Sequence, residues 1–295
     1  MKVVANGLSI EVEVHGPQEG DPVLLVMGLG MQLVAWPDEF IELLAGQGFR
    51  VLRYDHRDVG RSQWLDALGV PNLAWAGMRH ALGLQVTAPY GITDMAGDAL
   101  GVMDALGVAQ AHVCGVSMGG MIGQHLAAHH PSRVKSLTLM MTTAGARELP
   151  QPRWPARKAM MSRPRSAAPQ DVVDHVQRLM DVIGSPGYPT DPGLLAERTR
   201  AAAARAWHPA GTARHVAAVI ADGDRTPLLS RIQAPTHVMH GQDDPLVPCA
   251  AAEHLAAHIR GATLEIIPGM GHDLPGPLLP RLADGVVRNA RRARA

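Results

Sequence analysis

The sequence feature that most constrains the fold is the pentapeptide Gly-Val-Ser-Met-Gly at residues 115–119. The residues from Ala111 up to it are typical of a short buried strand, and residues 118–129 are apolar and helix-forming. A strand that turns abruptly into a helix holds the central Ser117 in a strained conformation with its hydroxyl exposed. The flanking glycines are needed because neighbouring backbone passes too close to the turn for a Cβ. A generic Gly/Ser loop is the alternative, but the flanking strand and helix favour a nucleophile elbow.

The order of elements along the chain predicts a mostly parallel sheet with helices on both faces, an α/β fold. Strands are expected from short alternating or continuous apolar runs, and helices from longer stretches between them. The expected strands are residues 8–14, 22–27, 50–55, 111–115, 134–141, 236–240 and 262–267. The expected helices are residues 37–47, 92–106, 118–129, 249–258 and a last one from about residue 278.

The strand–helix alternation stops between residues 145 and 230. This stretch is rich in proline at its start, contains helical patterns at 171–183 and 194–207, and has no apolar strand. We therefore expect a core formed by residues 1–144 and 231–295, with residues 145–230 as a helical cap inserted at the edge of the sheet.

Composition excludes several classes of function. The 295-residue chain is 46% hydrophobic and 18% charged, which is typical of a globular protein. Its 27 basic and 27 acidic side chains cancel, so neither nucleic acid nor an anionic membrane is an expected partner. The N-terminus has no signal-peptide pattern and the chain no 18-residue apolar span, which predicts a cytoplasmic protein. The basic ending, residues 288–294, is interpreted as the solvated end of a helix.

A serine nucleophile needs a base to take its proton and an acid to orient that base. Among fifteen histidines, His272 stands out because it lies in a glycine-rich loop directly after the last expected strand. Parallel sheets place functional groups at the carboxyl ends of their strands, and the order Ser, acid, His along the chain fits. A histidine that merely caps the last helix is the alternative.

The acid is expected after the preceding strand, where the loop 241–248 contains Asp243 and Asp244. Either can shape an Asx turn before a helix. Asp244 is preferred because the turn after Gly241 aims the fourth residue inward, whereas Asp243 can cap the turn or face water. No acidic residue directly follows the strand expected at 134–141, which strengthens this choice.

An oxyanion hole requires two amide donors near the serine. The amide of Met118 at the start of the elbow helix is one candidate. The amide of Leu29, in the loop after the strand at 22–27, is the other, and Gly28 beside it is a candidate substrate contact. Alternatively, Gly28 and Gly30 mark an ordinary tight turn.

Other patterns indicate structure rather than chemistry. His254 and His258 have helical i, i+4 spacing, but no Glu follows His254 and no third ligand is evident, so a solvated helix face is expected there and not a zinc site. Residues 115–120 lack the glycine spacing of a dinucleotide or phosphate loop, and the expected acyl transfer requires neither a metal nor an organic cofactor. Cys114 and Cys249 fall in separate elements, and a disulfide is not expected. The arginines of the 57–61 turn are interpreted as fixing a surface turn.

Four motifs occur in the order typical of the α/β-hydrolases: residues 54–62, 115–119, 241–248 and 269–272. Over residues 1–144 and 231–295 the chain resembles that family. Within the family, residues 26–28, 36–40 and the run through 61–62 are most similar to aclacinomycin methylesterase and related bacterial carboxylesterases. The resemblance implies a triad of Ser117, Asp244 and His272, with Leu29 and Met118 as oxyanion donors. It also implies an eight-stranded sheet and a helical cap over the site.

The chain departs from the family pattern at Met27-Gly28, where many relatives have His-Gly, so the first oxyanion loop is expected to be held differently. No match extends into the cap or into residues 63–90, and the substrate is therefore not implied. Trp64, Trp75, Trp154 and the methionines at 160 and 161 are hypothesised to line an apolar entrance. Ordinary packing of the cap on the core is the alternative.

The sequence thus predicts a serine hydrolase that cleaves a small-molecule carboxylic ester through an acyl-enzyme, as a monomer or homodimer. A lactonase or a carbon–carbon bond hydrolase would use the same residues. A ligand-binding protein with little turnover is the alternative from a different class of function.

Overall fold

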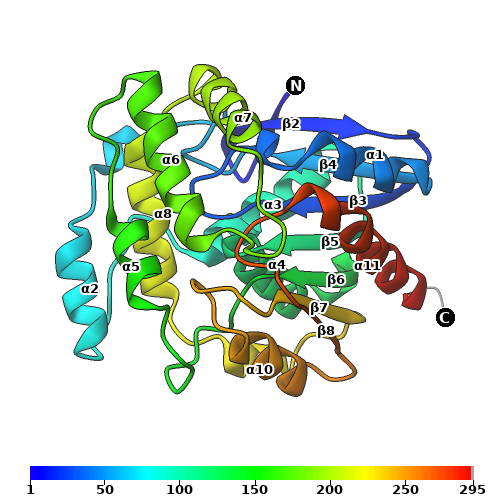
Figure 1. Ribbon diagram of the computed structural model, residues 1–295. Coiled ribbons are helices and arrows are strands. Elements are labelled where there is room, and N and C mark those ends of the chain that lie inside the picture. The colour runs from blue at the N-terminus through cyan, green and yellow to red at the C-terminus, as the bar shows by residue number, and fades with distance from the viewer. Residues whose placement is uncertain (294–295) are drawn as a thin grey trace.

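The computed structural model describes residues 1–293. Arg294 and Ala295, the end of the predicted core and of the basic terminus, lie outside the described residues. An eight-stranded sheet runs through the centre in the order β1-β2-β4-β3-β5-β6-β7-β8 (Figure 1). The strands are β1 (Lys2–Ala5), β2 (Leu8–His15), β3 (Asp21–Val26), β4 (Phe49–Tyr54), β5 (Ala111–Val116), β6 (Val134–Met140), β7 (Thr236–Gly241) and β8 (Thr263–Ile267).

The sheet is mostly parallel, as the sequence predicts. β2 is antiparallel to both β1 and β4, and all other neighbouring pairs are parallel. Strand β1 was not expected from the sequence, since it has only four residues, of which Ala5 alone is buried. In contrast, every residue of β5 is buried, because a central parallel strand is covered on both faces.

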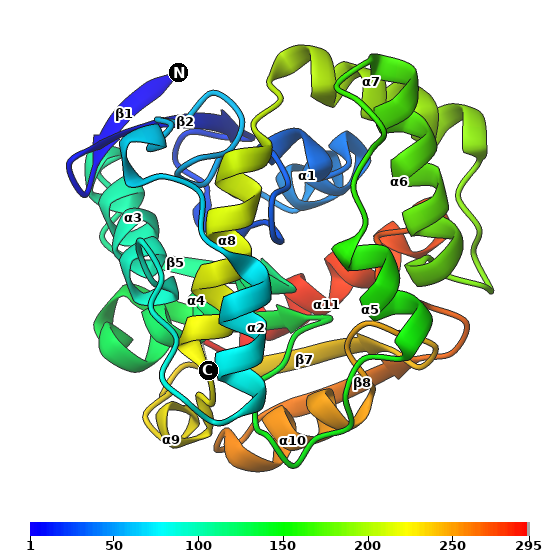
Figure 2. The ribbon, with the colours of Figure 1, turned by 90° about the vertical axis from the view of Figure 1, so that its left-hand side faces the viewer.

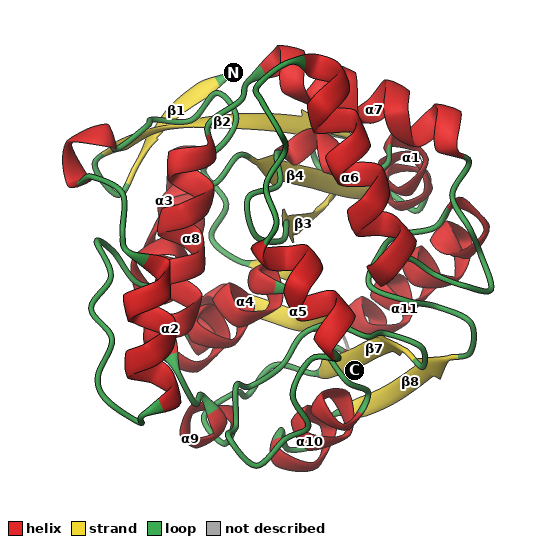
Figure 3. Ribbon diagram, turned by 60° about the vertical axis from the view of Figure 1, so that its left-hand side comes forward, coloured by secondary structure: helices red, strands yellow, loops and turns green. Residues whose placement is uncertain are grey.

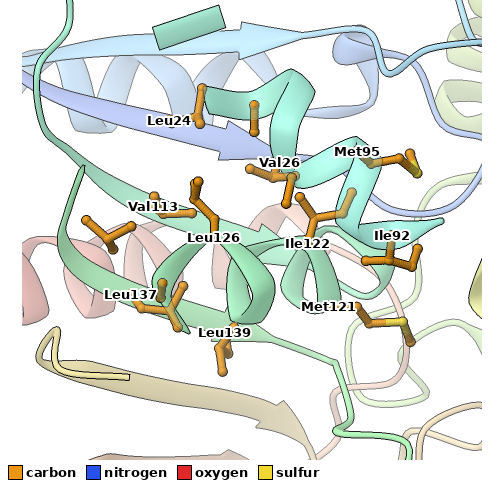
Figure 4. Packing of buried hydrophobic residues seen from close by; sticks show 14 of the residues in the cluster. Leu24, Val26, Ile92, Met95, Val113, Met121, Ile122, Leu126, Leu137 and Leu139 are labelled. Atoms are coloured by element: carbon orange, nitrogen blue, oxygen red, sulfur yellow. The ribbon is translucent and has the colours of Figure 1, made fainter. Parts of the chain in front are cut away.

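Helices cover both faces of the sheet (Figure 3). On one face lie α1 (Asp38–Gly46) and α11 (Leu279–Arg292), and on the other lie α3 (Ile92–Ala105), α4 (Met118–His129) and α10 (Ala250–His258). Alternate residues of one strand serve the two faces: Val26 packs on the α3–α4 side and Leu25 on the α1–α11 side. Figure 4 shows the packing on the α3–α4 side, where Ile122 and Leu126 of α4 lie over Val113 of β5.

Residues 145–230, called here the intervening segment, form helices without a strand. The helices are α5 (Trp154–Met161), α6 (Pro169–Ile183), α7 (Pro192–Arg205), α8 (Pro209–Asp222) and α9 (Thr226–Leu229). A further helix outside this segment, α2 (Leu73–Ala81), packs beside α8 (Figure 2).

The intervening segment does not sit at the edge of the sheet, as the sequence suggested, but across the carboxyl ends of its strands. Gly30, in the loop after β3, bonds to His215 of α8, and the amide of His272, after β8, donates to Ile183 at the end of α6. These loops follow strands from both halves of the sheet. The chain enters the segment from the carboxyl end of β6, which places the start of the segment at this edge of the sheet.

Among residues 1–293, no helix combines the length and the apolar character that crossing a bilayer would require.

A buried ion pair joins α8 to the turn after β4. The Arg214 guanidinium donates to both oxygens of Asp58 at 2.8 and 2.7 Å, and neither side chain is exposed. Asp58 also accepts from the Leu65 amide and the Tyr90 hydroxyl. Burial alone would raise the pKa of Asp58, but the hydrogen bonds from Arg214, Leu65 and Tyr90 outweigh it and lower that pKa.

The turn at 57–61 is therefore not the surface turn expected from the sequence. Arg57 is buried and donates to both oxygens of Asp98 on α3, at 2.6 and 2.7 Å. Arg57 and Asp58 face inward, because Asp98 on α3 and Arg214 on α8 supply them with buried partners, whereas Arg61 is exposed.

Replacing Arg214 with leucine should lower the free energy of unfolding by about 3–5 kcal/mol at pH 7, because Asp58 is left buried without its partner. The pKa of folded Asp58 lies below its unfolded value, so this pair stabilises at neutral pH and its contribution is lost as the pH falls through the folded pKa. Denaturant unfolding measures the change. Arg200→Leu, at an exposed position of α7, is the control; equal losses in the two variants would contradict the prediction.

Candidate active site

Ser117 occupies the sharp turn between β5 and α4. Its φ of 54° and ψ of −119° lie outside the regions that residues with a Cβ normally adopt. The strain is held in place by hydrogen bonds: the Ser117 amide donates to the Met140 carbonyl at 2.9 Å, and the Thr142 hydroxyl donates to the Ser117 carbonyl at 2.7 Å. The chain thus forms a strand–turn–helix elbow with Ser117 at its tip.

Two glycines beside Ser117 allow the elbow to pack. A Cβ added to Gly119 would lie well under 3.0 Å from the carbonyl oxygen of Val26 on β3. A Cβ added to Gly115 would meet the Gly119 carbonyl equally closely. The contact is with backbone, which cannot swing aside as a flexible side chain can, so only glycine fits at either position.

The three side chains expected to cooperate lie in hydrogen-bond contact. The Ser117 Oγ is 3.1 Å from Nε2 of His272, and Nδ1 of His272 is 2.6 Å from Oδ2 of Asp244. A carboxylate only accepts hydrogen bonds, so His272 carries its proton on Nδ1 and Nε2 is free to accept from the serine hydroxyl.

The two neighbouring aspartates have different environments. The Asp244 side chain is fully buried, and its Oδ1 accepts from the amides of Leu246 and Val247 at 2.8 Å each. Asp243 is exposed and accepts from the amide of Gly269 at 2.9 Å. Of the pair, only Asp244 contacts His272.

The loop that carries His272 is hydrogen bonded to residues at and just after the end of α6, and the sequence did not predict these bonds. The His272 amide donates to the Ile183 carbonyl at 2.7 Å, and the Ser185 hydroxyl accepts from the Gly271 amide at 2.8 Å while donating to Asp273. Burial raises the pKa of Asp273. No local pattern signals these bonds, because they join positions about 90 residues apart in the chain.

The loop after β3 lies against Ser117 from the other side. A Cβ on Gly28 would be 3.5 Å from the Cβ of Ser117. Within residues 1–293, no hydrogen bond from the Leu29 amide or the Met118 amide to a protein acceptor is described. In place of the His-Gly pattern, Nε2 of the buried His56 donates to the Met27 carbonyl at 2.8 Å.

The predicted aromatic contacts lie elsewhere. Trp64 stacks on His208, with ring centroids 4.2 Å apart, and lines a hollow of about 530 Å³ that Ser117 does not line. Trp154 begins α5 and is 69% exposed, and Trp75 on α2 is exposed as well. None of these tryptophans has a described contact with Ser117, so a role for Trp64 or Trp154 in substrate binding stays a prediction.

His254 and His258 on α10 stack on each other. The rings of His254 and His258 are 4.0 Å apart, and the structure describes no group of three or more His, Cys, Asp or Glu side chains within residues 1–293 that could hold a metal ion. Cys114 and Cys249 are both free thiols.

Comparison with known proteins identifies the family. A family model described as the alpha/beta hydrolase fold matches residues 21–275. The chain belongs to the α/β-hydrolase family.

This hydrolase is 31% identical over 291 residues to rhodomycin D methylesterase of Streptomyces peucetius, with 92% of this chain and 91% of that protein covered. It is 30% identical to 3-oxoadipate enol-lactonase 2 of Acinetobacter baylyi, over 64% of this chain and 67% of that protein. The crystal structure of the enol-lactonase from Burkholderia xenovorans LB400 superposes with a TM-score of 0.73 at 26% identity, covering 99% of this chain and 100% of that chain. The resemblance to methylesterases expected from the motifs is confirmed.

The Gly119→Ala variant should be strongly destabilised, because its Cβ would collide with the Val26 carbonyl and push α4 away from β3. Gly77→Ala is the matched control: it lies inside α2 with open space around it and should gain about 0.5–1 kcal/mol. Thermal unfolding measures both. A Gly119→Ala protein as stable as the wild type would show that the elbow is not packed as described.

Proposed function

We propose that this hydrolase cleaves a carboxylic ester of a small molecule by transferring its acyl group to Ser117. One observation carries the proposal: a hydroxyl on a strained elbow is hydrogen bonded to an imidazole whose other nitrogen meets a buried carboxylate. This arrangement activates an otherwise weak nucleophile. Support also comes from the similarity to rhodomycin D methylesterase, which is 31% identical in an alignment that covers 92% of this chain and 91% of that protein.

In the first step His272 accepts the hydroxyl proton at Nε2 while the Ser117 oxygen attacks the ester carbonyl. Asp244 orients the ring through Nδ1 and stabilises the imidazolium that forms. The alcohol departs with the proton from Nε2, leaving the acyl group on Ser117. Water then attacks the acyl-enzyme, again giving its proton to His272, and the acid is released.

The developing oxyanion would be bound by the amides of Leu29 and Met118. The absence of a protein acceptor for either amide in residues 1–293 supports these roles. The packing of Gly28 against Ser117 also supports them, since it brings the loop and the elbow together. Donors placed in advance stabilise the charge without rearranging as it forms.

We also propose that the intervening segment, residues 145–230, acts as a helical cap. Its α6 and α8 contact the loops that follow β8 and β3, on either side of Ser117. A substrate that reaches Ser117 must pass beside this segment, which would therefore shape the acyl and alcohol pockets.

A lactone is the second candidate substrate, favoured by the similarity to the enol-lactonase structure, which covers 99% of this chain. A lactone is a cyclic ester, so the same steps open its ring, but the alcohol stays attached to the acyl-enzyme. Comparing kcat/KM for linear methyl esters with that for an enol-lactone separates the two. A higher value for the lactone would replace the linear ester as the preferred class.

Ser117→Ala and His272→Ala should each reduce turnover of p-nitrophenyl butyrate by roughly a thousandfold or more, because both belong to one proton-transfer unit. A fluorophosphonate should label the wild-type protein at Ser117 and leave Ser117→Ala unlabelled. Turnover by Ser117→Ala at the wild-type rate would refute the proposal, and an inert wild-type protein would favour a ligand-binding role.

The neighbouring aspartates provide a matched pair of variants. Asp244→Asn should lose on the order of a thousandfold or more in kcat, because the amide favours the wrong tautomer of His272. Asp243→Asn, which alters only a bond to the Gly269 amide, should lose far less. Equal losses would remove the assignment of Asp244 as the acid.

A further inference from the structure

The oxyanion loop, residues 27–31, is bonded to a histidine of the intervening segment. The Gly30 amide donates to Nδ1 of His215 on α8 at 3.3 Å, and Nε2 of the same ring donates to the Arg57 carbonyl at 2.9 Å. An amide can only donate and a carbonyl can only accept, so the two bonds together require a neutral ring with its proton on Nε2.

The surroundings of His215 keep it in that form. The side chain is completely buried, and burial, followed by the neighbouring His56, lowers its pKa to about 3. The charged and titratable groups that face it are His56, Arg57, Asp58 and Tyr90. The Arg57 carbonyl and the Asp58 carboxylate favour the protonated ring but do not overcome burial.

The contact fixes the position of one residue in the loop. Gly30 has a φ of +67°, and a Cβ at this position would lie 2.8 Å from Cγ2 of Thr212, so the loop backbone lies directly against α8. At the other end of the loop, His56 holds the Met27 carbonyl. The Leu29 amide lies between these two anchors, and it is one of the two proposed oxyanion donors.

We propose that His215 is a positioning residue for the oxyanion hole. By holding the Gly30 amide toward α8, it fixes the adjoining peptide so that the Leu29 amide faces the oxygen of the reacting carbonyl. The intervening segment thereby contributes to transition-state stabilisation through a residue that does not touch substrate. This inference rests on the proposed function, since it concerns the same acyl transfer.

The test compares two replacements of His215. Leucine keeps much of the volume but neither hydrogen bond, whereas the side-chain amide of glutamine can accept from Gly30 and donate to Arg57. In His215→Leu we expect kcat for p-nitrophenyl butyrate to fall roughly tenfold to a hundredfold with little change in KM, as when an oxyanion donor is displaced. His215→Gln should recover most of this loss.

A second readout isolates the oxyanion hole. An alkyl trifluoromethyl ketone adds to the serine and places a negative oxygen in the hole, so it mimics the tetrahedral intermediate. Its inhibition constant should rise in His215→Leu by about the same factor as kcat/KM falls. A purely structural role would lower Tm without this matched change in inhibitor affinity.

The matched control is His125→Leu. His125 on α4 is also buried, and its Nε2 bonds to Asp222 at the end of α8 at 2.9 Å, so it joins the same helix to the core without contacting the oxyanion loop. This variant should lower Tm and leave both kcat and the inhibition constant near their wild-type values. If His215→Leu behaves in the same way, the proposal is wrong.

Wild-type protein supplies an independent measurement should His215→Leu fail to fold. Nitrogen-15 spectra of the histidines, assigned with His215→Gln, should show His215 as the neutral Nε2–H tautomer from pH 5 to pH 8, a range that lies wholly above its folded pKa of about 3. An Nδ1–H tautomer or an imidazolium would rule out the bond from Gly30 and overturn the proposal. Failure of this inference alone is recognised by fluorophosphonate labelling of Ser117 together with unchanged kinetics in His215→Leu.

Discussion

The close approach of backbone to backbone at the elbow is the constraint on which the site depends. The first turn of α4 lies against the carbonyl of Val26 at the end of β3, and only a glycine at position 119 allows this contact. The same approach brings the loop after β3 beside Ser117, which itself is held at a positive φ. A larger residue at position 119 would push the elbow, with Ser117 and the Met118 amide, away from the loop that carries Leu29, the other proposed oxyanion donor.

Buried polar side chains attach the intervening segment to the core, beside apolar contacts such as those of Ala218 and Leu229. Arg214 bonds to Asp58, Arg205 of α7 donates to Asp55 at 2.7 Å, and Ser185 bonds to the loop of His272. Buried ion pairs often contribute no more net stability than apolar packing of similar volume, but the two parallel bonds from Arg214 to Asp58 fix the relative orientation of these side chains. This attachment suits the proposed role of the segment, in which α6 and α8 hold the loops that carry His272 and Gly30.

Two features were not predicted from the sequence because charged or polar side chains are buried there. Helix α8 was missed because the buried face that should show apolar periodicity contains Arg214 and His215. The turn at residues 57–61 was taken for a surface turn because arginine and aspartate usually face water. In both places the charge is buried because a partner far away in the sequence compensates it. The boundaries of the predicted core and cap stay a prediction.

The sequence by itself determined the strand–helix order, the elbow around Ser117 and the loops that carry Asp244 and His272. These follow from local signals: apolar periodicity, glycine spacing and position after a strand. Only the tertiary structure decided which groups hold those loops, including the bond between Gly30 and His215, which are 185 positions apart. Such contacts depend on how two segments pack in space, and no local propensity encodes that geometry.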